Sequence, residues 1–571
     1  MRTKNKLFLR SWTAGVGLFL ALASPSVASE EEIRHSIAQL LDEEVTARAT
    51  AIEALARTKD PRVTQLLAAF QEGSIYEWND TLVFCPQMTT SEDGQKSAPL
   101  FDPLTRQRLD TDGKPLVVPS AGLRELGPTR RERRAVRDGL LLLRLFSAVP
   151  EERLASIQKC GDLRDLKFLE SLEELSSSET NADAQYTIRE SICLIRLGGK
   201  IPDQKLEDRL AAARELGEMR SPRGLPVLEE RLQELDAAAQ EGTPVNPVAS
   251  AAYRQAVEEI QSYRKYVHGF EHLFSGLSLG SILILMALGL SITFGLMGVI
   301  NMAHGELMMI GAYATYEMQR LFDLLVVEQW LPESAFNWYY VLALPVAFFS
   351  AALVGYFVER LVIRHLYGRP LETLLATWGV GLILIQGVRL LYGDNIGVNS
   401  PTWLRGGAEV LPQFILPYNR CFIIFLCVLC VALIYSLLNF TKLGLMVRAT
   451  MQNRAMADSL GVNTRRIDAY TFALGSGLAG IAGYALTLVG GVTPDMGQNY
   501  IVDSFLVVVT GGVGEIAGAV CAGLGLGVLN KLLEPQFEAV WAKVLILVCV
   551  VLFVQWRPSG LFPPKGRLAD A

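Results

Sequence analysis

Apolar residues follow two different patterns along the 571 residues of the chain. Up to about Gln240 they recur at intervals of three and four positions between charged residues, which is the pattern of amphipathic helices. Beyond His268 they gather into long runs that contain no Asp, Glu, Lys or Arg. This change of pattern predicts an all-α protein in which a water-soluble helical part precedes a polytopic helical membrane bundle.

The water-soluble part contains a sequence pattern that occurs twice. Residues 54–62 and residues 214–223 each end in a turn made of a polar residue, proline and arginine, and each is followed by a new apolar stretch. Proline is favoured in the first turn of a helix, so both turns predict the start of another helix. Successive helical pairs of this kind resemble HEAT-like repeats, which stack because one pair cannot bury its own apolar face. An irregular helical bundle is the alternative to stacked repeats. A less regular insert at residues 73–128 interrupts the helical pattern.

The second part contains enough uncharged segments for several membrane helices. Four of them reach the ~20 residues that a helix needs to cross a bilayer: residues 272–305, 334–358, 421–441 and 469–494. Shorter ones cover residues 373–388, 504–514, 516–530 and 544–556. We therefore expect eight or nine membrane helices, some of them broken by glycine.

The first 28 residues have the organisation of a secretory signal peptide. A basic start precedes a short apolar run at residues 12–23, and small residues follow at Ser26 and Ala28. The signal peptide is either cleaved or remains as a membrane anchor. In both cases the following domain is exported. If the first membrane helix starts outside, the segments that fall inside carry 11 of the 17 basic residues found after His268. This predicts a signal peptide (1–28), a periplasmic helical-repeat domain with linker (29–265) and a transmembrane domain (266–571) of a bacterial inner-membrane protein.

Charge and cysteine usage exclude several classes. The formal net charge of −6 argues against nucleic acid as a partner. Five of the eight cysteines lie in apolar segments, and the exported part has Cys85, Cys160 and Cys193, which permit at most one internal disulfide. With five histidines and no metal-ligand spacing, we expect neither a metal site nor a cofactor.

Two glycine-rich motifs place polar residues inside apolar segments. In residues 295–306 the candidates are Asn301, His304 and Glu306. Irregular backbone at membrane depth is tolerated where it is buried in protein or lines a cavity, so this motif predicts a broken helix on a translocation path. A tight cytoplasmic turn, with His304 capping a helix and Glu306 facing water, is equally compatible. In residues 510–518 the glycines favour close helix packing, and Glu515 is the path candidate.

A basic loop at residues 448–466 contains a short amphipathic helix that Gly461 ends, and Asn463 is placed to cap the next helix. This segment is interpreted as a binding site for a partner protein. The alternative is a plain helix at the membrane interface.

These segments resemble the permeases of branched-chain amino acid and urea ABC importers. The resemblance is carried by Asn-Met-Ala-His-Gly-Glu (301–306), Arg-Ala-Thr-Met-Gln-Asn-Arg-Ala-Met-Ala-Asp-Ser-Leu-Gly (448–461), Thr-Gly-Gly-Val-Gly-Glu-Ile-Ala-Gly-Ala (510–519) and Arg-Pro-Ser-Gly-Leu-Phe-Pro-Pro-Lys (557–565). The exported extension narrows the resemblance to the B-type permeases of urea transporters, because amino-acid permeases usually lack such a domain.

The resemblance implies a non-catalytic permease subunit that moves urea or a related short amide inward. It implies a second permease, two ATP-binding subunits that hydrolyse ATP, and a periplasmic solute-binding protein as partners. It also implies that residues 448–461 dock on the ATPase, with Ala455 standing where many ABC permeases have glutamate. The coupling residues are then Arg448, Arg454, Ala455, Ala457 and Gly461.

Other functions remain as alternatives. A branched-chain amino acid permease of the same family is the nearest, and a stand-alone channel for small solutes would need no docking segment. A membrane-anchored scaffold would need only one membrane helix. An enzyme is disfavoured, since the chain contains no Gly-x4-Gly-Lys-Ser/Thr phosphate loop and no catalytic triad or His-Glu-x-x-His pattern.

Overall fold

The computed structural model describes residues 30–42, 44–90, 96–111, 114–199, 206–242, 244–411 and 414–563. The predicted signal peptide lies outside these residues. The chain divides into two compact units, one up to Tyr263 and one from Arg264.

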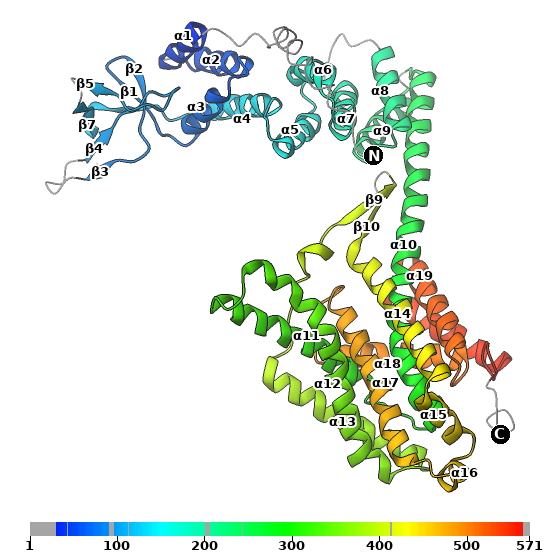
Figure 1. Ribbon diagram of the computed structural model, residues 1–571. Helices are drawn as coiled ribbons and strands as arrows, with labels where there is room; N and C mark the ends of the chain where they lie inside the picture. Colours follow the sequence, from blue (N-terminus) through cyan, green and yellow to red (C-terminus); the bar gives the residue numbers. More distant parts are fainter. Residues whose placement is uncertain are drawn as a thin grey trace, which may run out of the picture. The chain divides into compact units, whose positions relative to one another are not determined.

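The first unit is built mainly from short helices (Figure 1). They are α1 (Glu30–Ala38), α2 (Val45–Arg57), α3 (Pro61–Gln71), α4 (Arg130–Arg144), α5 (Pro150–Leu163), α6 (Leu169–Ser178), α7 (Ala182–Gly198), α8 (Leu206–Glu218) and α9 (Gly224–Gln240). The predicted restart at Pro61 is present, because Pro61 opens α3 and Asp60 caps it. Pro222, by contrast, lies in the turn before α9, where the Ser221 hydroxyl accepts a hydrogen bond from the Gly224 backbone.

Three apolar clusters hold the helices of this unit together. One surrounds Ile52 and Phe70, another Phe168 and Ile192, and a third joins α7, α8 and α9 to the start of α10 (Pro247–Met297) through Tyr253. Cys85, Cys160 and Cys193 are buried free thiols, so no disulfide joins them.

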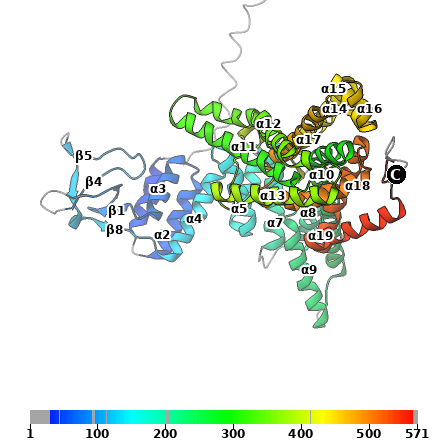
Figure 2. The same cartoon turned by 90° about the horizontal axis from the view of Figure 1, so that it is seen from below.

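The insert at residues 73–128 corrects the all-α expectation, because it forms strands. They are β1 (Ile75–Trp78), β2 (Thr81–Phe84), β3 (Thr89–Thr90), β4 (Lys96–Pro99), β5 (Asp110–Thr111), β6 (Lys114–Pro115), β7 (Val117–Pro119) and β8 (Arg124–Glu125). They form sheets of order β2-β1-β8 and β3-β4-β7 with a β5-β6 hairpin, gathered beyond α2–α4 in both views (Figures 1 and 2). Asn79 and Asp80 both have positive φ, 48° and 54°, as a tight two-residue hairpin turn between antiparallel strands requires.

The second unit is a bundle of longer helices. Besides α10 they are α11 (His304–Val327), α12 (Tyr339–Leu361), α13 (Pro370–Tyr392), α14 (Tyr418–Phe440), α15 (Lys442–Gln452), α16 (Arg454–Ser459), α17 (Thr464–Leu486), α18 (Met496–Gly511) and α19 (Ile516–Trp556). A hairpin of β9 (Gly407–Leu411) and β10 (Phe414–Pro417) precedes α14. The core of the bundle gathers around Tyr340 and Tyr484, whose rings stack at 4.3 Å.

Among the described residues six helices are long and apolar enough to cross a membrane: α10, α12, α13, α14, α17 and α19. The expected count of eight or nine is therefore not confirmed. Three features account for the difference. The helix α19 has non-helical backbone at Glu538, three residues after Pro535, and so contains two shorter helices. The helix α18 has only 16 residues, while α11 carries Glu317, Arg320 and Asp323 in its second half.

Candidate functional site

The segment between α14 and α17 contains two short helices, which corrects the expectation of a single one. Asn453 separates them with an extended backbone (φ −155°, ψ 100°), and its side chain accepts a hydrogen bond from the Met456 N–H at 3.0 Å. Asparagine is favoured at such a cap because its short side chain satisfies a free helical N–H. The five predicted coupling residues are thus divided, with Arg448 on α15, Arg454, Ala455 and Ala457 on α16, and Gly461 beyond it.

Gly461 ends this segment as predicted, and it does so in the left-handed conformation with φ of 86°. Its N–H donates to the Asp458 carbonyl at 3.0 Å, and the N–H of Val462 donates to the Ala457 carbonyl at 3.0 Å. These two bonds satisfy carbonyls that the end of α16 would otherwise leave free. Asn463 then caps α17 through the Arg466 N–H, as the sequence predicts. The segment therefore has a fixed shape and a defined end. We call α15, α16 and the turn to Asn463 the coupling segment.

The coupling segment exposes apolar side chains at its tip. The buried side chain of Ala457 packs α16 against the bundle, whereas Met456 and Leu460 are 58% and 77% exposed. Arg454 forms an ion pair with Asp468 of α17 and lies 4.8 Å from the ring centre of Tyr367. A polar hollow of about 830 Å³ lies beside α16. In Figure 1 the coupling segment lies at the end of the bundle opposite the β9–β10 hairpin. Exposed apolar groups with a polar rim are typical of a protein-binding surface.

The motif at residues 295–306 interrupts the helix as predicted. The helix α10 ends at Met297, Gly298 adopts φ of 66°, and α11 begins at His304. The side chain of Asn301 accepts a hydrogen bond from the Ala303 N–H at 3.1 Å, and Thr377 of α13 accepts one from the Met302 N–H at 3.1 Å.

The three polar candidates of this motif are all buried, so Glu306 does not face water. Asn301 and His304 are fully buried, and Glu306 is 6% exposed. His304 Nε2 lies 3.1 Å from the Met286 carbonyl, so this nitrogen carries the proton and donates it. Three atoms have no hydrogen-bond partner: Asn301 Nδ2, His304 Nδ1 and Glu306 Oε2. Buried polar atoms without partners are rare and call for an explanation.

The starts of two helices meet at this point. A Cβ atom on Gly305 would lie 2.5 Å from the Gly497 carbonyl oxygen, so the start of α11 and the start of α18 touch backbone to backbone. A Cβ atom on Gly381 of α13 would lie 3.0 Å from the Glu306 carboxyl carbon. Gly381 is half-way along the 23 residues of α13, about 16 Å from either end. Because the hydrocarbon core of a bilayer is about 30 Å thick, Glu306 lies near mid-depth.

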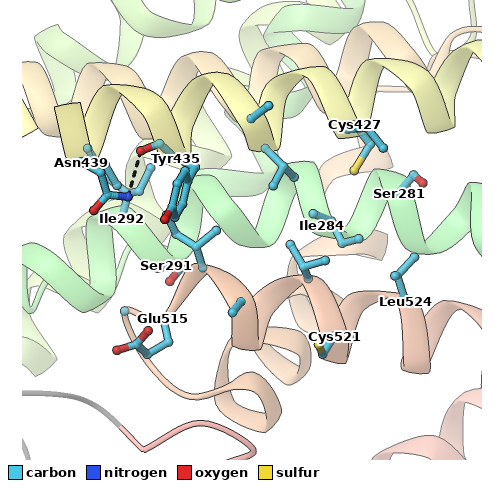
Figure 3. A pocket seen from close by; sticks show the side chains of 18 of the residues that line it. Ser281, Ile284, Ser291, Ile292, Cys427, Tyr435, Asn439, Glu515, Cys521 and Leu524 are labelled. Atoms are coloured by element: carbon cyan, nitrogen blue, oxygen red, sulfur yellow. Dashed lines mark hydrogen bonds between the residues drawn. The ribbon is translucent and has the colours of Figure 1, made fainter. Parts of the chain in front are cut away.

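The fourth path candidate, Glu515, lies elsewhere. It precedes α19 and lines a cavity of about 1090 Å³ between α10, α14 and α19, together with Arg448 of the coupling segment (Figure 3). Gly514, next to Glu515, packs against Gly295, whereas His304 contacts α10 at Met286. These contacts are nine residues apart on α10, or about 14 Å along its axis. The structure thus groups Asn301, His304 and Glu306 and separates Glu515 from them.

Sequence reasoning missed the residues of α13 that lie against this motif, with Gly381 beside the Glu306 carboxyl and Thr377 at the Met302 N–H. Thr373, Thr377 and Gly381 are buried on a helix whose other side chains are mostly exposed. Their spacing of four places them on one face of the helix. That row of polar and small residues in an apolar helix was the available signal. Ser291, Tyr435 and Asn439 of the cavity were missed as well, since they lie on two separate helices (Figure 3).

The fold is that of a polytopic helical membrane protein whose core contains a buried helix break before α11. Residues 272–554 match the family described as the branched-chain amino acid transport system permease component. Residues 208–234, which include most of α8 and α9, match the PBS lyase HEAT-like repeat. No solved structure matches the chain significantly.

Individual relatives cover the same half. The branched-chain amino acid permease BraD of Pseudomonas aeruginosa is 29% identical over 305 residues, which are 52% of this chain and 95% of BraD. LivH of Escherichia coli is 27% identical over 307 residues, 52% of this chain and 96% of LivH. LivM of the same organism is 27% identical over 318 residues, 50% of this chain and 69% of LivM.

The membrane unit belongs to the branched-chain amino acid permease family of ABC-type transport systems. Its relatives are named as permease components of transport systems and not as enzymes. Family membership and the six apolar helices fit a multi-pass inner-membrane protein.

Proposed function

We propose that this chain is the permease subunit of an ABC importer and that its coupling segment receives the motion of separate ATPase subunits. The observation that carries the proposal is the combination of family membership with a capped coupling segment whose tip exposes Met456 and Leu460. A stand-alone channel would have no use for such a segment. The partners are a second permease, two ATPases and a periplasmic solute-binding protein, and the LivH/LivM pair among the relatives supports the second permease.

The solute is a branched-chain amino acid in the first of two versions of this proposal. The relatives named after that substrate support it, as does the buried carboxylate of Glu306, which can serve as counter-ion to an ammonium group. Leucine needs contacts for two charges and for an isobutyl group, which a path of mixed apolar and polar groups supplies.

Urea is the second candidate, and one observation favours it. The match to BraD covers 95% of that protein but only 52% of this chain. The amino-acid permease thus has no counterpart of the helical extension, whereas the B-type urea permeases that the sequence resembles have one. Urea offers N–H donors and a carbonyl acceptor, so its path requires hydrogen bonds without a fixed counter-charge.

The extension is proposed to be a HEAT-like domain exported by the signal at residues 1–28. The match at residues 208–234 and the distribution of basic residues in the membrane half support this arrangement. Its location can be read from protease accessibility in spheroplasts. Digestion of the extension in intact spheroplasts is expected, and its protection would contradict the export.

Uptake of labelled solute decides between the two versions. Cells that contain the complete system should accumulate leucine in the first version and urea in the second, with the other solute unable to compete at tenfold excess. A strain that lacks only this chain is the control. Equal uptake in the presence and absence of this chain would contradict the importer proposal as a whole.

A further inference from the structure

The start of α11 combines three features that packing alone does not require. It is a helix N-terminus near mid-depth, it touches the start of α18 at Gly497, and it carries the unpartnered buried atoms of Asn301, His304 and Glu306. An ionisable side chain at this depth costs roughly 2.5–3.5 kcal/mol on insertion scales. No basic side chain forms a salt bridge with Glu306 within the described ranges. A ligand therefore explains this buried carboxylate better than the fold does.

The unpartnered atoms have complementary chemistry. Asn301 Nδ2 can only donate hydrogen bonds, and Glu306 Oε2 accepts them when the carboxyl is ionised. His304 Nδ1 is an acceptor, because Nε2 carries the proton toward the Met286 carbonyl. The N-terminus of α11 adds the positive end of a helix dipole. A ligand that fits presents an oxygen acceptor to Asn301 and the helix end, and an N–H group to Glu306.

We infer that the start of α11 is the solute-recognition site of the permease, in which Glu306 accepts the N–H groups of the solute while Asn301 and the α11 N-terminus bind its oxygen. The inference rests on the proposed transport function and adds the residues that recognise the solute. Both candidates share the required chemistry. Leucine places its ammonium on Glu306 and its carboxylate at the helix end, whereas urea places its amino groups and its carbonyl there.

The contact with α13 explains how the carboxylate is aimed. The absence of a side chain at Gly381 leaves the space that the Glu306 carboxyl occupies, since a Cβ atom there would lie 3.0 Å from its carboxyl carbon. Thr377, one turn earlier on α13, holds the interrupted backbone through the Met302 N–H. Gly379 of the same helix has open space around it, so it provides a matched control for changes at Gly381.

Substitutions at Glu306 separate the two solutes. Glu306→Gln keeps the size and one acceptor oxygen but removes the charge, so leucine uptake should fall roughly 10- to 100-fold, as expected for a lost charge-assisted hydrogen bond. Urea needs no charge, and its uptake with Glu306→Gln should remain within about threefold of wild type while Glu306→Leu abolishes it. Glu317→Gln, on the exposed part of α11, is the control and should transport like wild type. Gly381→Ala should lower uptake of either solute, and Gly379→Ala should not.

A binding measurement keeps this site separate from the transport proposal. A hydrophobic carbodiimide should modify Glu306 of the purified complex, as located by peptide mass spectrometry, and leucine or urea should slow the modification at least fivefold. ATPase recovery with Glu306→Gln should match wild type, which excludes a coupling defect. Wild-type-like uptake with both Glu306→Gln and Glu306→Leu, or modification that neither solute slows, would overturn the inference. If the wild type carries neither solute, the proposed function fails, and the carbodiimide result still decides the site because it depends on binding alone.

Discussion

Arg454 of the coupling segment reaches a buried carboxylate, that of Asp468 on α17, and forms an ion pair with it. The side chain of Asp468 is 4% exposed, while that of Arg454 is 45% exposed and also lies over the ring of Tyr367. The pair joins a helix at the surface of the bundle to a helix at its centre. Backbone close approaches at Gly475 and Gly480 connect α17 in turn to α10 and α12. These contacts form a continuous path from α16 to the core of the bundle.

Removal of the arginine should uncouple α16 from α17. Arg454→Ala leaves the Asp468 carboxylate buried without a partner, which costs about 1–3 kcal/mol. We expect a lower melting temperature of the purified complex and reduced solute-stimulated ATPase activity. Adding Asp468→Asn should restore part of the stability, because a neutral amide is less costly to bury. Arg466→Ala, on the exposed start of α17, is the control. Identical behaviour of Arg454→Ala and Arg466→Ala would contradict the role of the pair.

Gly461 tests the shape of the coupling segment. A β-branched residue with φ of 86° is strained by roughly 1–2 kcal/mol, and the surrounding space is open, so the cost is conformational and not a clash. Gly461→Val should leave expression and insertion intact while it weakens ATPase recovery and abolishes transport. Gly461→Asn should retain both, because asparagine tolerates this conformation. Equal ATPase recovery and uptake with Gly461→Val would leave a plain interfacial helix as the reading of this segment.

Features that depend on local chemistry could be predicted from the sequence. The left-handed Gly461, the Asn463 cap and the interruption before His304 all follow from residue types within one or two turns. The hairpin at Asn79 and Asp80 was equally local, and its aromatic and β-branched flanks were a readable strand signal that the surrounding Pro and Gly residues obscured.

Features that depend on distant contacts could not be predicted in this way. Thr377 and Gly381 lie more than 70 residues from the motif that they support, and their position on one face of α13 does not specify which segment they contact. Gly497 is almost 200 residues from Gly305. The separation of Glu515 from Glu306 likewise depends on which turn of α10 each segment contacts, and no periodicity specifies this.

The extension should lose stability in acid. Side-chain hydrogen bonds from Arg62 lower the pKa of Asp60, which also caps α3. A carboxyl whose pKa is lower in the folded state than in the unfolded state stabilises the fold at pH values above its unfolded pKa, about 3.9. This contribution is lost as the pH falls through the folded pKa. The melting temperature of the extension should therefore decrease below about pH 4. Asp60→Asn keeps a cap and does not titrate, so its melting temperature should fall less over the same range. Superimposable pH profiles would contradict this assignment.

The extension should also fold alone, provided that the start of α10 is retained. Tyr253, Ala256 and Ile260 complete the apolar cluster of α7, α8 and α9. A fragment of residues 30–263 should be monomeric and give a strongly helical circular dichroism spectrum. A fragment of residues 30–246 exposes that cluster and should melt at lower temperature or aggregate. An unfolded or β-rich spectrum of the longer fragment, or equal stability of the two, would contradict this account of the core.

The backbone contact between α11 and α18 offers the last test. A methyl group at Gly497 would enter the space of the Gly305 carbonyl and would lie 2.9 Å from the Glu306 nitrogen, and neither backbone atom can turn aside. Overpacking of this kind costs typically 1–3 kcal/mol. Gly497→Ala should therefore lower the melting temperature of the purified permease, and it should impair uptake more than the stability loss explains, because the start of α11 must shift. Gly387 on α13 has open space around it, so Gly387→Ala supplies the matched control. If the two variants melt and transport alike, the helices are not held together at this point, and the mid-depth junction described above is wrong.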